Sequence, residues 1–395
     1  MVDHNKFINE RINKSKSENA FRTLKCNKDL IDFCSNDYLG FAKETTIHHI
    51  NNNTSELLNY GATGSRLISG NYALTEETEA FLANFYNTHA ALIFNSGYNA
   101  NIGLFQCLPQ RNDTIIYDEL IHASIRDGIR LSNASNFSFT HNNLAALEQK
   151  LSNAKGLLYV VVESVYSMDG DIAPLSEIVA LCKKYHAALI VDEAHAVGIF
   201  GNGNGLVSEL SLENDVFARI VTFGKAFGVH GAAILGSNEL RNYLINFSRA
   251  FIYTTALPLH SIITIKNAHE FLLQNLNRIN TLKELINHFR NLTSNAEKTR
   301  IENSLFFRAS SKNEFFKEKH FSGLETLNSI SAIQCIIIPG NNEVKIMADK
   351  LQQNGFDVRP ILSPTVPKGQ ERLRICLHSF NSKQEVDNLV NTLKR

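Results

Sequence analysis

The stretch of sequence that decides the fold is Leu175-Ser-Glu-Ile-Val-Ala-Leu-Cys-Lys-Lys-Tyr185, followed closely by Ala188-Leu-Ile-Val-Asp-Glu-Ala-His195. In the first part the apolar residues recur at the spacing of one helix face. The second part opens on a continuous apolar run, which is typical of a strand covered on both sides. A helix that leads directly into a buried strand predicts an α/β fold built on a parallel sheet.

The same alternation extends along the middle of the chain. Segments of helical periodicity separate four further β-branched runs, at 91–94, 114–117, 157–162 and 220–222. We therefore expect residues 46–260 to form a large domain with a mainly parallel sheet between helices. Residues 1–45 are rich in Asn and Lys and are expected to form an N-terminal segment.

The last third of the chain predicts a smaller α/β domain. A helical connector should begin near residue 261 and lead into this C-terminal domain, which would end at residue 395. Its expected elements are strands near 331–338 and 372–377, with an amphipathic helix at 343–354 between them.

Composition excludes several classes of protein. The 39 Lys and Arg residues balance 39 Asp and Glu residues, so no basic surface for nucleic acid or an anionic membrane is expected. The six cysteines are scattered without a C-x-x-C pair, which argues against a disulfide framework and against a metal site. Because the N-terminus is polar and no apolar run is long enough for a membrane helix, we expect a cytoplasmic protein.

The end of the run at 188–191 carries the first candidate chemistry. Asp192 should project from the carboxyl end of its strand, the edge at which open α/β sheets bind ligands, and His195 follows on the loop. Asp192 can pair with a cationic ring nitrogen, and His195 can donate to an oxyanion. The alternative is that Asp192 caps the following turn and His195 is a surface imidazole. Asp-Glu-Ala-His also spells a helicase motif, but the phosphate loop that a helicase requires is missing.

A lysine between glycines is the second candidate. Lys225 lies in Val221-Thr-Phe-Gly-Lys-Ala-Phe-Gly228, directly after an apolar run. Gly224 and Gly228 would let a planar ligand approach the backbone, and burial favours the neutral amine that a Schiff base needs. Thr222, expected one helical turn before the lysine, could place its hydroxyl on a phosphate.

Three other clusters are less specific. Asn95-Ser-Gly-Tyr-Asn99 precedes an expected helix, where backbone amides can bind an anion or Ser96 can act as a plain N-cap. His122 follows a strand, although a lone histidine is more often structural. Arg372 and Arg374 share one face of a strand and could grip a carboxylate, or else form the basic face of an edge strand.

Taken together and in this order, the clusters resemble the α-oxoamine synthases, a family of fold-type I enzymes that depend on pyridoxal 5′-phosphate (PLP). The resemblance covers nearly the whole chain. The matching stretches are Ser35-Asn-Asp-Tyr-Leu-Gly40, Gly61-Ala-Thr-Gly-Ser-Arg66, Ser96-Gly-Tyr98, His122-Ala-Ser124, Ser167-Met-Asp-Gly170, Asp192-Glu-Ala-His195, Thr222-Phe-Gly-Lys225, Tyr253-Thr-Thr255, Thr365-Val-Pro367 and Arg372-Leu-Arg374.

The resemblance implies a role for each residue that would contact the cofactor's ring. Lys225 is expected to hold PLP as a Schiff base, and Asp192 to pair with the pyridinium nitrogen. His122 should stack on the ring. His195 should contact the phenolic oxygen, with Ser167 near it.

The resemblance also implies the phosphate and substrate contacts. The amides of Gly97 and Tyr98, together with Thr222, should cradle the phosphate. Further phosphate contacts, from Thr254 and Thr255, are expected across a homodimer interface. Arg374 should bind the carboxylate of the amino acid. The other residues expected in the substrate pocket are Asn36, Arg22 and Thr365.

The implied reaction is a decarboxylative condensation of an amino acid with an acyl thioester, both small molecules. L-Alanine with a pimeloyl thioester is the preferred pair. Glycine with acetyl-CoA, glycine with succinyl-CoA, and serine with a long-chain acyl thioester stay open, as does the choice between coenzyme A and a carrier protein. One departure is Thr75, which stands where many members of the family carry a histidine.

Overall fold

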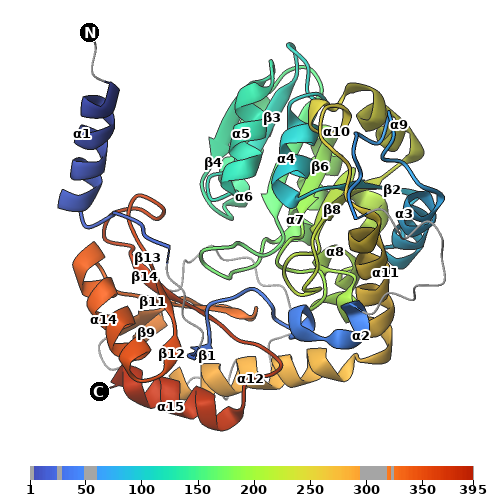
Figure 1. Cartoon of the computed structure of the whole chain (residues 1–395). Coiled ribbons are helices and arrows are strands. Elements are labelled where there is room, and N and C mark those ends of the chain that lie inside the picture. Colours follow the sequence, from blue (N-terminus) through green and yellow to red (C-terminus); the bar gives the residue numbers. More distant parts are fainter. Residues whose placement is uncertain (1–3, 25–28, 49–59, 294–317, 322–323, 395) are drawn as a thin grey trace. The chain divides into compact units, whose positions relative to one another are not determined.

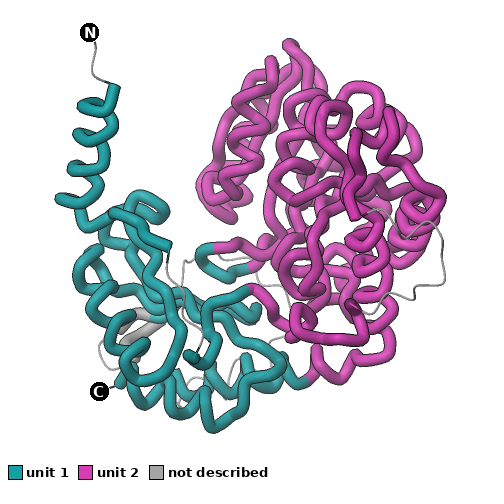
Figure 2. The backbone as a smooth tube through the Cα atoms, in the orientation of Figure 1, with its two compact units in different colours: residues 1–35, 168–171, 281–395 teal, residues 36–167, 172–280 magenta. Residues whose placement is uncertain are grey.

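The computed structural model describes residues 4–24, 29–48, 60–293, 318–321 and 324–394 (Figure 1). It divides into two compact units, one of residues 36–167 and 172–280, the other of residues 1–35, 168–171 and 281–395 (Figure 2). The boundaries expected from the sequence near residues 45 and 260 stay predictions about separable domains.

A seven-stranded sheet forms the centre of the unit of residues 36–167 and 172–280. Its strand order is β2-β8-β7-β6-β5-β3-β4, and every neighbouring pair is parallel except those that involve β8. The strands are β2 (Ala90–Phe94), β3 (Thr114–Asp118), β4 (Ser135–Phe139), β5 (Leu158–Glu163), β6 (Ala187–Asp192), β7 (Ala218–Thr222) and β8 (Ala232–Gly236). The mainly parallel sheet predicted from the sequence is confirmed.

Helices cover this sheet and alternate with its parallel strands, as Figure 1 shows. They are α2 (Thr45–His48), α3 (Ala73–Phe85), α4 (Gly97–Phe105), α5 (Ala123–Leu131), α6 (Leu144–Asn153), α7 (Leu175–Tyr185), α8 (Leu206–Glu209), α9 (Asn238–Phe247), α10 (Arg249–Ile252) and α11 (Leu259–Gln274), with α12 (Asn277–Thr293) leading out of the unit.

The core of this unit packs α4, α5, α9 and α10 against alternate strand residues. Phe94, Val161 and Ile220 contribute from three strands, and Leu104 and Ile125 contribute from two helices. The intervening strand residues, such as Val160 and Val191, are also fully buried. Burial on both faces explains why the strands read as continuous apolar runs.

The unit of residues 1–35, 168–171 and 281–395 holds a five-stranded antiparallel sheet in the order β13-β14-β11-β10-β9 and a short parallel pair of β1 with β12. Its elements are α1 (His4–Ser17), β1 (Ile31–Asp32), β9 (Glu318–Phe321), β10 (Leu324–Thr326), β11 (Ile333–Ile337), α14 (Asn341–Gln353), β12 (Phe356–Asp357), β13 (Arg359–Ile361), β14 (Arg372–Cys376) and α15 (Lys383–Lys394). Among the described residues, no helix combines the length and apolarity needed to cross a bilayer.

Candidate active site

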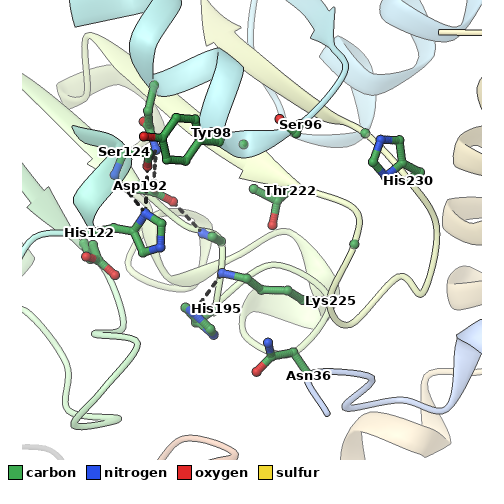
Figure 3. Close-up of a pocket in the computed structure, with 16 residues that line it drawn as sticks. Asn36, Ser96, Tyr98, His122, Ser124, Asp192, His195, Thr222, Lys225 and His230 are labelled. Atoms are coloured by element: carbon green, nitrogen blue, oxygen red, sulfur yellow. Dashed lines mark hydrogen bonds between the residues drawn. The ribbon is translucent and has the colours of Figure 1, made fainter. Parts of the chain in front are cut away.

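A pocket of about 270 Å³ lies at the carboxyl ends of the parallel strands (Figure 3). Eight of the residues for which a cofactor or substrate contact is expected line it: Asn36, Gly97, Tyr98, His122, Asp192, His195, Thr222 and Lys225. They come from segments up to 189 residues apart, counted from Asn36 to Lys225. The fold therefore gathers most of the candidate residues of the larger unit at one place.

Lys225 and His195 meet in this pocket. The Lys225 Nζ lies 2.8 Å from the His195 Nε2, and the His195 Nδ1 lies 2.8 Å from the hydroxyl of Tyr38. His195 is buried, so the alternative that it is a surface imidazole is wrong. The contacts on both ring nitrogens fix the orientation of the imidazole beside the lysine.

Asp192 is held by two neighbours. Its Oδ1 accepts a hydrogen bond from the backbone N–H of Ala194 at 2.9 Å, and its Oδ2 accepts one from the side-chain amide of Asn101 at 2.8 Å. Asp192 therefore does cap the following turn, and it also lines the pocket. The turn-capping explanation is therefore confirmed, whereas the pairing of Asp192 with a ring nitrogen stays a prediction.

His122 caps helix α5 from within the pocket. Its Nδ1 accepts from the backbone N–H of Ser124 at 3.2 Å and lies 2.7 Å from that residue's hydroxyl. Burial lowers the pKa of His122; the nearby Lys225 charge acts in the same direction, while Asp192 opposes it. These influences favour a neutral imidazole at this position.

The turn at the start of α4 forms another part of the pocket. Ser96 accepts a hydrogen bond from the N–H of Asn99 at 3.2 Å, as an N-cap does. A side chain on Gly97 would collide with the Cγ2 of Thr222. The hydroxyl of Thr222 is buried and has no hydrogen-bond partner among the described residues. Backbone N–H groups and an unpartnered hydroxyl thus meet where an anion can be bound.

Two details of the lysine segment differ from the sequence interpretation. Thr222 ends strand β7, and the lysine follows in a hairpin loop, so no helical turn separates them. Gly228 has φ +62°, and its Cα packs against the backbone of Phe41 and Ala42. Gly224, by contrast, lines the pocket, and an added Cβ there would make only an ordinary contact with the carbonyl oxygen of Val229, so of these two glycines it is Gly224 that lets a ligand approach.

The remaining candidates of the larger unit lie outside this pocket. Ser167 is buried but is not among the lining residues. Thr254 lines a different, small cavity, together with Thr75 and Arg66. The carbonyl of Thr255 accepts a hydrogen bond from the Asn95 side chain at 2.6 Å.

The other candidates, Arg22, Thr365 and Arg374, belong to the unit of residues 1–35, 168–171 and 281–395, and the contacts given next lie within that unit. The guanidinium of Arg22 donates to the hydroxyl of Thr365 at 2.9 Å, so these two residues are brought together. Arg372 pairs with Asp169, and Arg374 contacts the Sγ of Cys376 at 2.9 Å. Both arginines are buried, and β14 lies between β13 and β11, so the edge-strand alternative is wrong.

Three lining residues with polar side chains were not predicted from the sequence: Asn101, Glu163 and His230. Glu163 ends β5 as Asp192 ends β6, so the rule that polar residues ending parallel strands share one sheet edge could have found it. Asn101 lies within helix α4, and its place in the pocket becomes apparent only from its hydrogen bond to Asp192 in the folded structure. Among the described residues, no group of His, Cys, Asp and Glu has the arrangement of a metal site.

Comparison with known proteins identifies the family of this chain. The family model of the class I and II aminotransferases matches residues 28–393. An 8-amino-7-oxononanoate synthase of Emericella nidulans is 38% identical over 385 residues, covering 92% of this chain and 88% of its own.

Solved structures show the same fold. A structure of SPT (serine palmitoyltransferase) with the PLP internal aldimine has a TM-score of 0.82 and 25% identity, covering 98% of this chain and 96% of its own. The 8-amino-7-oxononanoate synthase of Francisella tularensis has a TM-score of 0.69 and 28% identity, covering 93% and 98%. The chain therefore belongs to the class I and II aminotransferase family, and within it to the PLP-dependent α-oxoamine synthases.

Proposed function

We propose that this chain is an 8-amino-7-oxononanoate synthase, which joins L-alanine to the pimeloyl group of a thioester with loss of carbon dioxide, in biotin biosynthesis. The observation that carries the proposal is the pocket in which Lys225 lies beside His195, at the strand ends that also present Asp192 and Thr222. The E. nidulans relative and the F. tularensis structure both carry this enzyme name.

The pocket fits PLP. The buried, unpartnered hydroxyl of Thr222 and the side-chain-free Gly97 leave a place for the phosphate at the start of α4. Asp192, fixed by Asn101 and Ala194, would face the ring nitrogen. When bound, PLP supplies an electron sink for the pair of electrons released at the amino acid's Cα.

The protein's own groups would then act in sequence. Lys225 would hold the cofactor through its amine and, once displaced by the amino acid, take the proton from Cα. His195, held by Tyr38, would donate a hydrogen bond to the phenolic oxygen. Neutral His122 would cover the ring face, with Ser167 near His195. Arg374 would bind the amino acid's carboxylate, with Arg22, Thr365 and Asn36 completing the substrate pocket.

A homodimer is part of the proposal. The segments 64–70 and 253–256 are joined by a hydrogen bond from the N–H of Ala256 to the carbonyl of Gly64. They expose large apolar side chains: Leu67 at 50%, Ile68 at 85% and Tyr253 at 72%. Apolar surface of this kind is typical of a subunit interface. A second copy of the chain would cover it and receive phosphate contacts from Thr254 and Thr255.

We also propose a cytoplasmic location. The cysteines in the described part of the chain are free thiols, and four of them have a pKa raised to about 11 or 12, mainly by burial: Cys107, Cys182, Cys335 and Cys376. Thiols that are buried and protonated suit a reducing compartment.

Product analysis tests the reaction. The full-length enzyme with PLP would be given L-alanine, glycine or L-serine, each with pimeloyl-, acetyl-, succinyl- or palmitoyl-CoA. Free thiol and product mass would be measured, and a pimeloyl carrier protein would be tested as a second donor. We expect the highest kcat/KM for L-alanine with a pimeloyl donor. A preference for glycine with acetyl-CoA or serine with palmitoyl-CoA would instead identify a glycine C-acetyltransferase or a serine palmitoyltransferase. The E. nidulans relative carries neither of these two enzyme names.

A further inference from the structure

His230 lies in the hairpin that carries the lysine. Strands β7 and β8 are antiparallel neighbours, with Thr222 opposite Ala232. The N–H of Phe223 donates to the carbonyl of Gly231, and the N–H of Val229 donates to the carbonyl of Phe223. His230 therefore lies between Val229 and Gly231, which both bond to Phe223 across the hairpin. His230 also lines the pocket (Figure 3).

The sheet register brings His230 to the start of helix α4. Strand β8 also pairs with β2, with Phe94 opposite Ala232. Continuing this antiparallel register by two residues sets Ser96 alongside His230. In Figure 3 His230 accordingly lies on the side of Ser96 and Thr222, away from His122.

The neighbourhood of His230 is suited to an anion. Ser96 is the N-cap and Gly97 the first residue of α4, a helix of nine residues, and both line the pocket. The first N–H groups of a helix favour binding of an anion. The Thr222 hydroxyl is more than nine-tenths buried and has no partner among the described residues. His230 itself is exposed and makes no hydrogen bond within the described part of the chain. An imidazole N–H is thus available at the same end of the pocket.

We infer that His230 is a phosphate-binding residue, which donates a hydrogen bond from its ring to the phosphate of the cofactor. This inference rests on the proposed function only in taking the phosphate of PLP to lie at the start of α4. A hydrogen bond to a charged group is among the stronger ones, because donor and acceptor attract each other electrostatically. His230 would add this bond to those from the α4 amides and Thr222.

Cofactor affinity, measured with and without the phosphate, tests the inference. PLP release from the full-length holoenzyme would be measured by equilibrium dialysis for wild type, His230→Phe and His230→Gln. The same chains would then be loaded with pyridoxal, which lacks the phosphate. We expect His230→Phe to weaken PLP binding about tenfold, the effect of one hydrogen bond to a charged group, and to leave pyridoxal binding unchanged. His230→Gln, which keeps an N–H donor, should retain most of the affinity.

The control is His89→Phe, the same substitution just before the amino end of β2, which should alter neither affinity. Unchanged PLP binding by His230→Phe would overturn the inference. So would an equal loss of PLP and pyridoxal binding, or a raised KM for the acyl thioester alone. The proposed function is judged separately, because wild-type holoenzyme that binds PLP but forms no 8-amino-7-oxononanoate would contradict that function and not the role of His230.

Discussion

Two carboxyl groups end neighbouring strands at the pocket, and their surroundings differ. Glu163 and Asp192 are opposite each other in the parallel register of β5 and β6. Burial raises the pKa of Glu163 well above its ordinary value, and the negative charge of Asp192 raises it further. The Oε1 of Glu163 has no hydrogen-bond partner among the described residues. Burial and the neighbouring carboxylate therefore favour the neutral form of Glu163, while Asp192 is the carboxyl group held by hydrogen bonds from Asn101 and Ala194.

Glu163→Gln should stabilise the protein increasingly as pH rises. The folded pKa of Glu163 is raised, so its stabilising contribution is complete below the unfolded value of about 4.3 and is lost as pH rises toward the folded pKa. The neutral amide has no such loss. We expect the melting temperature of the variant to exceed that of the wild-type holoenzyme at pH 8 by about 2 °C or more, and by less at pH 5. A difference independent of pH would show that Glu163 is ionised in both states.

Tyr38→Phe should act through His195. The substitution removes the hydroxyl that lies 2.8 Å from the His195 Nδ1, while the aromatic ring stays. The imidazole would lose the contact on its Nδ1, and misplaced hydrogen-bond donors cost about tenfold or more in rate. We expect kcat to fall by about tenfold with little change in the KM for alanine, and the visible band of the bound cofactor to shift. A variant with an unchanged spectrum and kcat would show that His195 needs no support from Tyr38.

At the scale of elements, the lysine loop is held by close backbone approaches. Gly228 has φ +62°, and an added side chain would collide with the backbone N–H of Ala42. Beneath the loop, the buried His269 stacks on Phe227 at a ring distance of 4.0 Å and contacts the hydroxyl of Tyr86 at 2.9 Å. The loop is thus packed on both sides, which restricts where the Lys225 amine can lie.

Gly228→Ala tests this packing against a matched control. Gly355 also has a positive φ, +91°, but nothing lies within 4 Å of an added Cβ. Both substitutions strain the backbone by about 1 kcal/mol or more, and only the first adds a collision with backbone atoms. We expect Gly228→Ala to lower the melting temperature more than Gly355→Ala and to weaken the absorbance of the lysine-bound cofactor. Equal effects of the two variants would contradict the close approach.

The elements predicted from the sequence are those with strong local patterns. The buried parallel strands and the helices at 175–185 and 343–354 have continuous or periodic apolar residues and are confirmed to within a few residues. Strand β4 was missed because most of it is an exposed, polar edge strand. Strand β8, Ala-Ala-Ile-Leu-Gly, is short and rich in small residues, so its antiparallel place beside β7 depends on the hairpin rather than on its composition.

At the scale of the whole molecule, the residues singled out in the sequence are divided between the two compact units. Lys225, Asp192 and His195 belong to one unit, whereas Arg22 and Arg374 belong to the other. Motifs that follow strands could be placed from the sequence because parallel strands end at one sheet edge. Contacts such as that of Asn101 with Asp192 could not, because they depend on how a helix packs on the sheet. The predicted dimer likewise depends on surfaces rather than on local pattern.

Hybrid dimers test whether the site is shared between subunits. One chain would carry Lys225→Ala, and the other would carry Thr254→Ala with Thr255→Ala. Each homodimer should be impaired. A hybrid should contain one site that has both Lys225 and intact threonines from its partner. Random mixing by co-expression should restore about a quarter of wild-type turnover, since half the dimers are hybrids with one complete site each. Activity no higher than the average of the two homodimers would contradict a shared site.

The most direct test of the central claim, that Lys225 carries the cofactor, is to locate the bond. The holoenzyme would be reduced with borohydride, digested, and examined by mass spectrometry for the peptide that bears the pyridoxyl group. We predict the label on Lys225, within Thr222-Phe-Gly-Lys-Ala-Phe-Gly228, and its loss together with turnover in Lys225→Ala. A label on a different lysine, or a Lys225→Ala enzyme that keeps full turnover, would contradict the account.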